Sequence, residues 1–250
     1  MGLLRAATVT LGLLLLWQAL VWVTAVPPFI LPSPQAVGAT LVQRWPLLLG
    51  HASVTAAEIL LGLLLGVLLG TIAALLLASA TVLRRWLLPL LVASQAIPVF
   101  ALAPLLVLWL GYGMASKVAM ATLIIFFPVT AAFYDGLRRT DPGWLALAQT
   151  MGGTRYAILR HIAIPAALPA FTSGLRVATA VAPIGAVVGE WVGSSAGLGH
   201  LMLNANARMQ TDLMFAALLV LTAMALLLYY AVDFLGRRLL PWLPESQPRS

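Results

Sequence analysis

Cysteine is missing from this sequence of 250 residues, and charged residues make up only 8% of it. Without cysteine, the chain has no disulfide bond, no thiolate metal site, no iron–sulfur cluster and no cysteine nucleophile. Hydrophobic residues account for 62% of the sequence, which is well above the share found in soluble domains. The composition therefore predicts a protein that lies in a lipid bilayer.

The sequence also lacks the motifs of nucleotide binding and metal binding. Its only lysine, Lys117, does not follow a glycine-rich phosphate-binding loop, so we do not expect the chain to hydrolyse ATP itself. Its three histidines, His51, His161 and His200, show no ligand spacing. We therefore expect no metal ion, no cofactor and no enzymatic activity.

Six mainly apolar runs are long enough to cross a membrane as helices, which takes about 20 residues each. The predicted fold is thus all-α, with six transmembrane helices. The first run could instead be a signal peptide, but Pro27-Pro28 is a poor cleavage context and an uncleaved helix is favoured. The six runs are Ala6–Val26, Ile59–Leu83, a part of Trp86–Ser116, Val118–Tyr134, about Pro165–Glu190 and Leu213–Val232.

Basic residues set the expected orientation of these helices. Arg44, Lys117 and Arg208 fall outside in the six-helix arrangement, and Arg176 falls within the membrane. Because cytoplasmic loops carry an excess of Lys and Arg, both termini are expected in the cytoplasm, with the chain in the inner membrane. The net charge of +7 then reflects topology, so nucleic-acid binding is not expected. The other ten basic residues, at positions 5, 84, 85, 138, 139, 155, 160, 237, 238 and 249, fall inside.

The segments between these helices divide the chain into three parts. Residues 1–52 combine the first helix with a proline-rich external turn, Pro27–Pro34, and an interfacial segment, Gln35–His51. Residues 53–237 form the main membrane domain. Residues 238–250 are a cytoplasmic tail, whose end from Pro241 on is expected to be disordered.

The long polar stretch from Arg138 to Arg176 predicts two short helices separated by a turn. Asp141 and Pro142 are typical of a helix start, and Gly152-Gly153 is typical of a helix end. This first helix is too short to be stable alone and therefore needs a partner. Its apolar stripe consists of Trp144, Leu145, Ala148 and Met151.

The second short helix is expected to begin at Thr154 and to carry Arg155 and Arg160. We expect it to end near Ile164, because Pro165 cannot donate the next backbone hydrogen bond.

This loop resembles the cytoplasmic coupling loop of ABC importer permeases, whose signature is EAA, three residues, Gly, nine residues and I-x-L-P. Here Ala146 replaces the usual Glu and Leu147 the middle Ala. The resemblance implies a type I importer permease fold (MetI-like) and a coupling loop over residues 138–165. The implied coupling residues are Ala146, Leu147, Ala148, Gly152, Arg155, Ile162, Ile164 and Pro165.

The same resemblance implies the partners of the chain. Two ATPase subunits would dock on the coupling loops, an extracytoplasmic solute-binding protein would deliver the solute, and a second permease, expected to be an identical copy, would complete the pathway in the bilayer. The runs 127–141 and 182–193 resemble permeases for pyrimidine precursors of thiamine, of the hydroxymethylpyrimidine type. The alternative is a nitrate, taurine or alkylsulfonate permease. A secondary transporter is disfavoured because no two related halves are visible.

Polar residues and prolines inside the membrane indicate where the pathway could run. Gln95 and Pro98 lie in the third run, where prolines free backbone carbonyls that a cavity can satisfy. Arg176 faces the pathway or extends to the interface, and Glu190, followed by Trp191, acts as a gate or as a helix cap.

Three glycines in the second run have a spacing of four residues, which places them on one helix face. That face either forms a contact between two copies or packs within one chain. The three are Gly62, Gly66 and Gly70.

Overall fold

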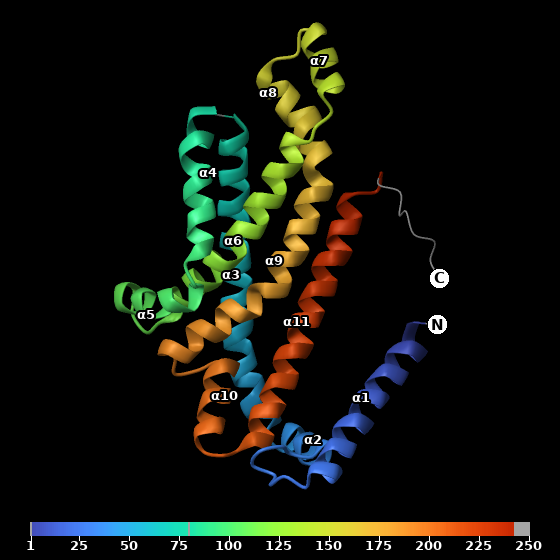
Figure 1. Ribbon diagram of the computed structural model, residues 1–250, viewed down its shortest axis with the longest axis vertical. Coiled ribbons are helices and arrows are strands. Elements are labelled where there is room, and N and C mark those ends of the chain that lie inside the picture. The colour runs from blue at the N-terminus through green and yellow to red at the C-terminus, as the bar shows by residue number, and fades with distance from the viewer. Residues whose placement is uncertain (1, 80, 243–250) are drawn as a thin grey trace.

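The computed structural model describes residues 2–79 and 81–242, and every regular element among them is a helix (Figure 1). Five helices are long and apolar enough to cross a membrane. The predicted all-α membrane fold is therefore confirmed, and the tail beyond Trp242 lies outside the described residues. The five helices are α1 (Gly2–Thr24), α3 (Trp45–Ser79), α6 (Met114–Arg138), α9 (Ile164–Gly193) and α11 (Thr211–Leu239).

The remaining elements are shorter. Helix α2 follows the proline-rich turn, α4 and α5 occupy the region of the third run, α7 and α8 form the long polar stretch, and α10 precedes the last long helix. Their bounds are α2 (Pro34–Gln43), α4 (Thr81–Ala96), α5 (Val99–Leu110), α7 (Pro142–Thr150), α8 (Arg155–Ile158), the π-helical turn η1 (Leu159–Ala163) and α10 (Leu198–Ala207).

The third span differs from a single kinked helix. Helices α4 and α5 are bent by 100° with respect to each other, so together they form a broken span or a re-entrant segment. The break falls at Ile97-Pro98, because Pro98 has no backbone N–H and disfavours helical backbone at Ile97. Arg84 and Arg85 lie within the first turns of α4, whereas the sequence suggested that they close the preceding span.

The core of the bundle consists of α3, α6 and α9, which pack closely through small residues. A Cβ atom at Gly66 of α3 would stand 2.5 Å from Ile125 Cγ2 of α6, and one at Gly62 would overlap Ala121. At Gly70 the nearest atoms also belong to α6. The glycine face of α3 therefore packs against α6 of the same chain. Of the two alternatives for this face, the structure shows packing within one chain and not a contact with a second copy.

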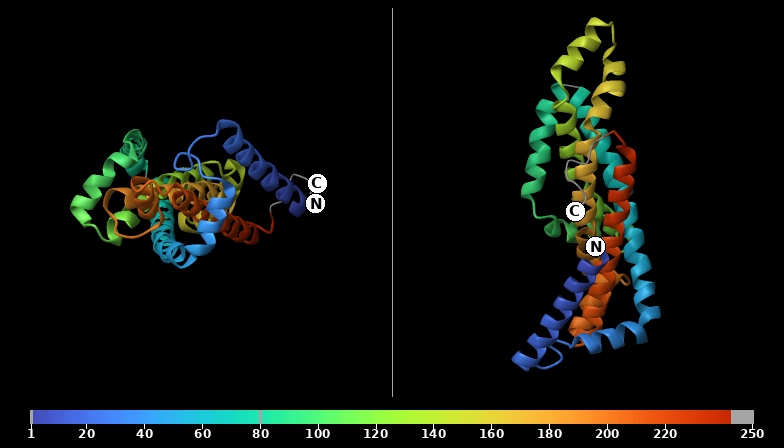
Figure 2. Two further views of the ribbon diagram at one scale, coloured as in Figure 1. Left: turned by 90° about the horizontal axis from the view of Figure 1, so that it is seen from below. Right: turned by 90° about the vertical axis from the view of Figure 1, so that its right-hand side faces the viewer.

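The two ends of the bundle carry different elements (Figure 1). Helices α7 and α8 protrude at one end, whereas α2 and α10 lie at the other. Helix α1 leans away from the bundle in both figures, and none of its membrane-crossing window is buried (Figure 2). Its contact with the rest of the chain includes Trp17, which donates a hydrogen bond to the Pro32 carbonyl and packs on Phe215.

Candidate functional site

The protruding end begins with helix α7, which starts as its sequence predicts. The side chain of Asp141 accepts a hydrogen bond from the Gly143 N–H at 2.7 Å, and Pro142 occupies the first helical position. A carboxylate cap satisfies one of the N–H groups that an α-helix leaves free at its start. The predicted N-terminal cap is therefore confirmed.

Helix α7 ends in a Schellman motif at the two predicted glycines. Gly153 N–H donates to the Ala148 carbonyl at 2.9 Å and Gly152 N–H to the Gln149 carbonyl at 3.0 Å. Gly152 has a φ angle of 80°, in the left-handed region that favours glycine. The predicted end of the first short helix is confirmed.

The second short helix starts as predicted but does not end near Ile164. Thr154 Oγ1 accepts a hydrogen bond from the Ala157 N–H at 3.2 Å. The helix then continues through the π turn η1 into α9, so that Arg155–Gly193 forms one continuous helical segment. The wider π turn shifts the hydrogen-bond register just before Pro165, which lies in the first turn of α9, where its missing N–H is tolerated.

We call residues 138–165 the coupling hairpin, and its apolar side chains face outward. Helix α7 has no buried residue, and Trp144, Leu147 and Met151 are each more than half exposed. These three side chains line a cavity of about 750 Å³ together with Ile162, Pro165 and, from beyond α11, Trp242. The hairpin thus presents an apolar surface that nothing in the described chain covers.

The other coupling residues lie around this surface. Ala146 and Arg155 are exposed, whereas Ala148 and Ile164 are half-buried at the edge of the hairpin. The structure therefore brings the residues of the predicted coupling loop together on one protrusion.

At the opposite end of the bundle, Glu190 holds the start of α10. Its side chain is buried, with a relative exposure of 1%. Its carboxylate accepts one hydrogen bond from Thr55 Oγ1 at 2.6 Å and two from the backbone N–H groups of Gly199 and His200. Of the two roles considered for Glu190, the geometry is that of a helix cap, and it reaches across three helices.

Helix α3 supplies the remaining acceptors for the start of α10. His51 Nδ1 accepts from the Gly197 N–H at 3.0 Å, and Thr55 Oγ1 accepts from the Leu198 N–H at 2.8 Å. Together with Glu190, these side chains satisfy the four consecutive N–H groups of residues 197–200. A helix start whose first N–H groups are all bonded to side chains is held firmly, because an unpaired N–H inside a protein costs about 1 to 3 kcal/mol.

Two further charged residues lie in this cluster, and neither was predicted from the sequence to belong to it. Lys117 is buried at 1% exposure and donates hydrogen bonds to the carbonyls of Tyr112, Gly113 and Gly193. Glu58 is buried beside Glu190 and Lys117. Its position seven residues after His51, with Thr55 between them, is the signal that could have revealed this face of α3.

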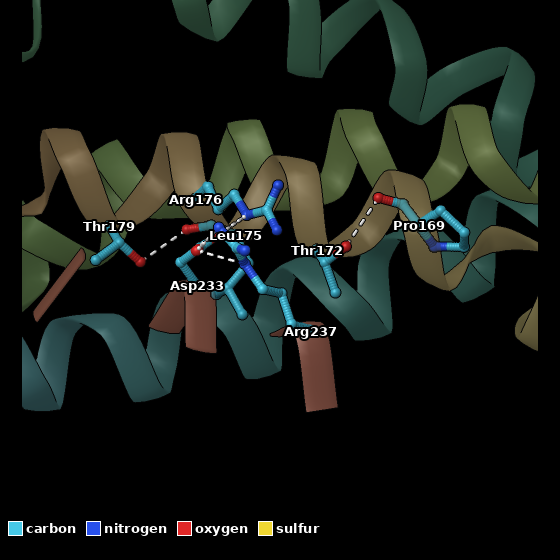
Figure 3. A network of polar contacts seen from close by, with 7 residues as sticks. All are labelled: Pro169, Thr172, Leu175, Arg176, Thr179, Asp233 and Arg237. Atoms are coloured by element: carbon cyan, nitrogen blue, oxygen red, sulfur yellow. Dashed lines mark hydrogen bonds and ion pairs between the residues drawn. The ribbon is translucent and has the colours of Figure 1, made fainter. Parts of the chain in front are cut away.

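Arg176 has its partner on another helix (Figure 3). Its Nε atom lies 2.6 Å from Asp233 Oδ1 of α11, and Arg237 approaches the other Asp233 oxygen at 2.8 Å. The ion pair joins α9 to α11, and the sequence did not suggest Asp233 as the partner. Arg176 and Glu190 do not pair with each other, as their spacing along α9 predicts.

The other residues proposed for the pathway lie apart from the Glu190 cluster. Gln95 is exposed near the end of α4, and Pro98 marks the break between α4 and α5. Trp191 is half exposed even though it follows Glu190 directly. In residues 2–79 and 81–242, no group of three His, Cys, Asp or Glu side chains could hold a metal ion.

The long apolar helices, the broken span and the protruding hairpin describe a polytopic membrane subunit of the permease class. Residues 66–243 match the family described as the binding-protein-dependent transport system inner membrane component, and the chain belongs to this family. It is an ABC importer permease, a multi-pass membrane component of a transport system.

Three relatives support the membership of the chain in this family. A probable ABC transporter permease protein of Haemophilus influenzae is 58% identical, covering 90% of this chain and 92% of the relative. The formylaminopyrimidine transport permease protein ThiX of Halalkalibacterium halodurans is 40% identical, covering 86% of each. The riboflavin transport system permease protein RibX of Chloroflexus aurantiacus is 41% identical, covering 94% of this chain and 88% of the relative.

The fold matches an inward-facing structure of the MetNI methionine ABC transporter. The TM-score is 0.69 with 19% identity, over 79% of this chain and 98% of that one. The expected MetI-like permease fold is confirmed.

Proposed function

We propose that the coupling hairpin is the docking site of a separate ATPase subunit. Its short helix α7 exposes Trp144, Leu147 and Met151, and nothing in the described chain covers them. A helix of nine residues is marginal without tertiary contacts, and exposed apolar side chains in a cluster mark an interaction surface. This exposed apolar hairpin is the observation that carries the proposal.

The docking contact is expected to be mainly apolar. Ala146 stands where a Glu is usual, so no salt bridge from that position is available. Leu147 and Trp144 supply apolar area instead, and Arg155 supplies the nearby positive charge. We expect Ile162, Ile164 and Pro165 to anchor the hairpin on α9 while α7 enters the ATPase.

The assembly would contain two copies of this chain, two ATPase subunits and an extracytoplasmic binding protein. The hairpin end faces the cytoplasm in this proposal, because it carries the excess of basic residues, and both termini are cytoplasmic. The membrane domain comprises residues 53–237. The broken span with Gln95 and Pro98 is placed at the wall of the shared pathway, and Trp191 near its outer end.

The proposed solute is a pyrimidine precursor of thiamine. The support is the 40% identity to a formylaminopyrimidine permease over most of both chains. A second candidate is riboflavin, because a riboflavin permease is similar at 41% identity. Both named solutes contain a planar pyrimidine ring, so a planar nitrogen heterocycle is the substrate class that both relatives favour.

The test is uptake into vesicles that contain the chain with its ATPase and binding protein. We expect formylaminopyrimidine to accumulate with ATP but not with a non-hydrolysable ATP analogue. Riboflavin uptake in place of formylaminopyrimidine would replace the first candidate by the second. Accumulation driven by an ion gradient without ATP would refute the proposal.

The orientation is tested with a reporter that is active only in the cytoplasm. Fusions after Arg85, Arg139 or Arg238 are expected to be active, and fusions after Pro34 or Gly113 silent. Activity after Gly113 would contradict the orientation.

A further inference from the structure

Helix α10 is a short element held by polar bonds at its first turn and by apolar packing along one side. It has ten residues, and its apolar side, which includes Leu201 and Ala205, packs into a cluster with α3 and α11. Residues in the left-handed region flank it, Gly197 at a φ angle of 108° and Met209 at 55°. Backbone that turns sharply at both ends of a short helix lets the helix reorient as a unit.

The polar bonds at this first turn come from two different helices. His51 and Thr55 belong to α3, and Glu190 belongs to α9. Thr55 is the central member, because its hydroxyl donates to Glu190 at 2.6 Å while accepting from the Leu198 N–H at 2.8 Å. Removing this one hydroxyl breaks both bonds.

The glycines of this turn are fitted closely to the carboxylate. A Cβ atom at Gly197 would overlap the Glu190 carboxyl group, and one at Gly199 would stand 2.8 Å from Glu190 Oε2. The contact therefore depends on the close approach of backbone to a buried charge. Such an arrangement has a well-defined seated state and loses its bonds together when α10 moves.

Glu190 also lies on the helix that reaches the coupling hairpin. The continuous segment Arg155–Gly193 starts in the hairpin and ends three residues beyond Glu190 (Figure 1). Along its length it packs on α6 through Gly174, Gly185 and Gly189, at positions where a Cβ atom would meet α6. The hairpin and Glu190 therefore lie at the two ends of one helical segment that packs closely on α6.

We propose that Glu190 and Thr55 form a latch that keeps α10 seated over the end of the bundle, and that movement of the coupling hairpin releases it through α9. Glu190 is in this sense a positioning residue, which acts through α10 on access to the pathway. The seated latch is a property of the chain itself, whereas its release by the ATPase rests on the proposed function.

The first experiment uses the absence of cysteine from the chain. A single cysteine is placed at Ala205, which is 2% exposed when α10 is seated, and its labelling by a polar maleimide is timed in membranes that contain the full chain. In Thr55→Val the labelling rate is expected to rise about tenfold, equivalent to about 1.4 kcal/mol. Thr55→Ser restores the hydroxyl and should return the parental rate.

Thr179→Val is the matched control. Thr179 is also fully buried, but its hydroxyl donates only to the Leu175 carbonyl of its own helix, so its loss should leave labelling at Ala205 unchanged. Equal labelling in Thr55→Val and the parent overturns the latch. If Thr55→Val does not accumulate, His51→Ala is used instead. It removes the hydrogen bond from Gly197 and the stacking on the His200 ring, and the labelling rate is expected to rise about threefold. A rate unchanged from the parent overturns the latch equally.

The second experiment adds the ATPase subunit and a non-hydrolysable ATP analogue. We expect faster labelling in the parent and no further increase in Thr55→Val, whose latch is already open. Parental uptake driven by ATP without any change in labelling would overturn the release through α9. Absence of ATP-driven uptake would instead refute the proposed function, while the comparison of Thr55→Val with Thr55→Ser still decides the latch.

Discussion

At the hairpin end of the segment Arg155–Gly193, the cap bonds of α7 and α8 join residues no more than five positions apart in sequence. At the Glu190 end, the bonds from Thr55 and His51 span 135 to 146 positions. The hairpin has exposed caps and an apolar surface that is free for a partner. In the Glu190 cluster, the capping side chains of Glu190 and Thr55 are buried and that of His51 is half-buried.

The contrast separates two ways to hold a short helix in a membrane protein. Among the described residues, the cap bonds of α7 stay within the hairpin, so they hold the shape of α7 without fixing it to the bundle. Long-range caps tie α10 to α3 and α9, so that α10 keeps its place only while those helices keep theirs. A hairpin that keeps its own shape and a short helix that is held by distant side chains suit the two ends of a helical segment that transmits movement.

The largest expected effect is at the buried end. Glu190→Gln removes the charge and one of the two acceptor oxygens, so an amide NH₂ has to face either Thr55 Oγ1 or the N–H groups of Gly199 and His200. We expect a loss of about 3 kcal/mol in the free energy of unfolding, since a buried hydrogen-bonded charge is replaced by an imperfect partner. Denaturant titration of the chain in mixed micelles measures it.

Asp233→Asn is the control for this change. It makes the same chemical replacement in the ion pair with Arg176, whose side chain is 35% exposed. Both arginine partners of Asp233 are partly exposed, Arg176 at 35% and Arg237 at 59%, so a smaller loss than at Glu190 is expected, of no more than about 1 kcal/mol. If Asp233→Asn destabilised the chain more than Glu190→Gln, the buried cluster would not be the stronger tie.

An intermediate effect is expected at the end of α7. No atom lies within 4 Å of the place where a Cβ would stand at Gly152, so Gly152→Val meets no clash and its cost is backbone strain at a φ angle of 80°. That strain is about 2 kcal/mol for a β-branched residue. Because the hairpin is tied only locally, we expect normal insertion and unfolding but reduced association with the ATPase, measured by co-purification.

Gly152→Asn serves as the matched variant, because Asn adopts the left-handed region more readily than other residues with a side chain. Its ATPase association should remain close to that of the parent. Equal association in the Val and Asn variants would show that the conformation of Gly152 does not aim the helix.

The difference between the two ends also explains which caps could be predicted from the sequence. The caps at Asp141 and Thr154 and the stop at Gly152 use residues within a few positions of their partners, and each was predicted. The predicted end of the second short helix, near Ile164, was wrong. A π turn, which has no simple sequence signature, continues the helix past Pro165.

The buried cluster was not predictable to the same extent. Glu190 was singled out because an acid at that depth is costly, but its partners on α3 lie more than 130 positions away. Glu58 directly precedes the second predicted run and was assigned no role from the sequence, although it is buried beside Glu190. Which helices pack against each other depends on the tertiary structure. The spacing of the three glycines in α3 did not by itself indicate that their partner is α6.

The smallest expected effect tests whether the hairpin caps are truly independent of the bundle. Asp141→Ala removes the acceptor for the Gly143 N–H and should cost about 1 kcal/mol, confined to α7. Amide hydrogen exchange over residues 142–150 should then accelerate about fivefold, whereas exchange in α9 and α10 stays at the parental rate. Asp141→Ser supplies another capping oxygen and should restore slow exchange. Faster exchange in α10 of the Ala variant would mean that the two ends are coupled in the resting chain, and the contrast between local and long-range caps would have to be abandoned.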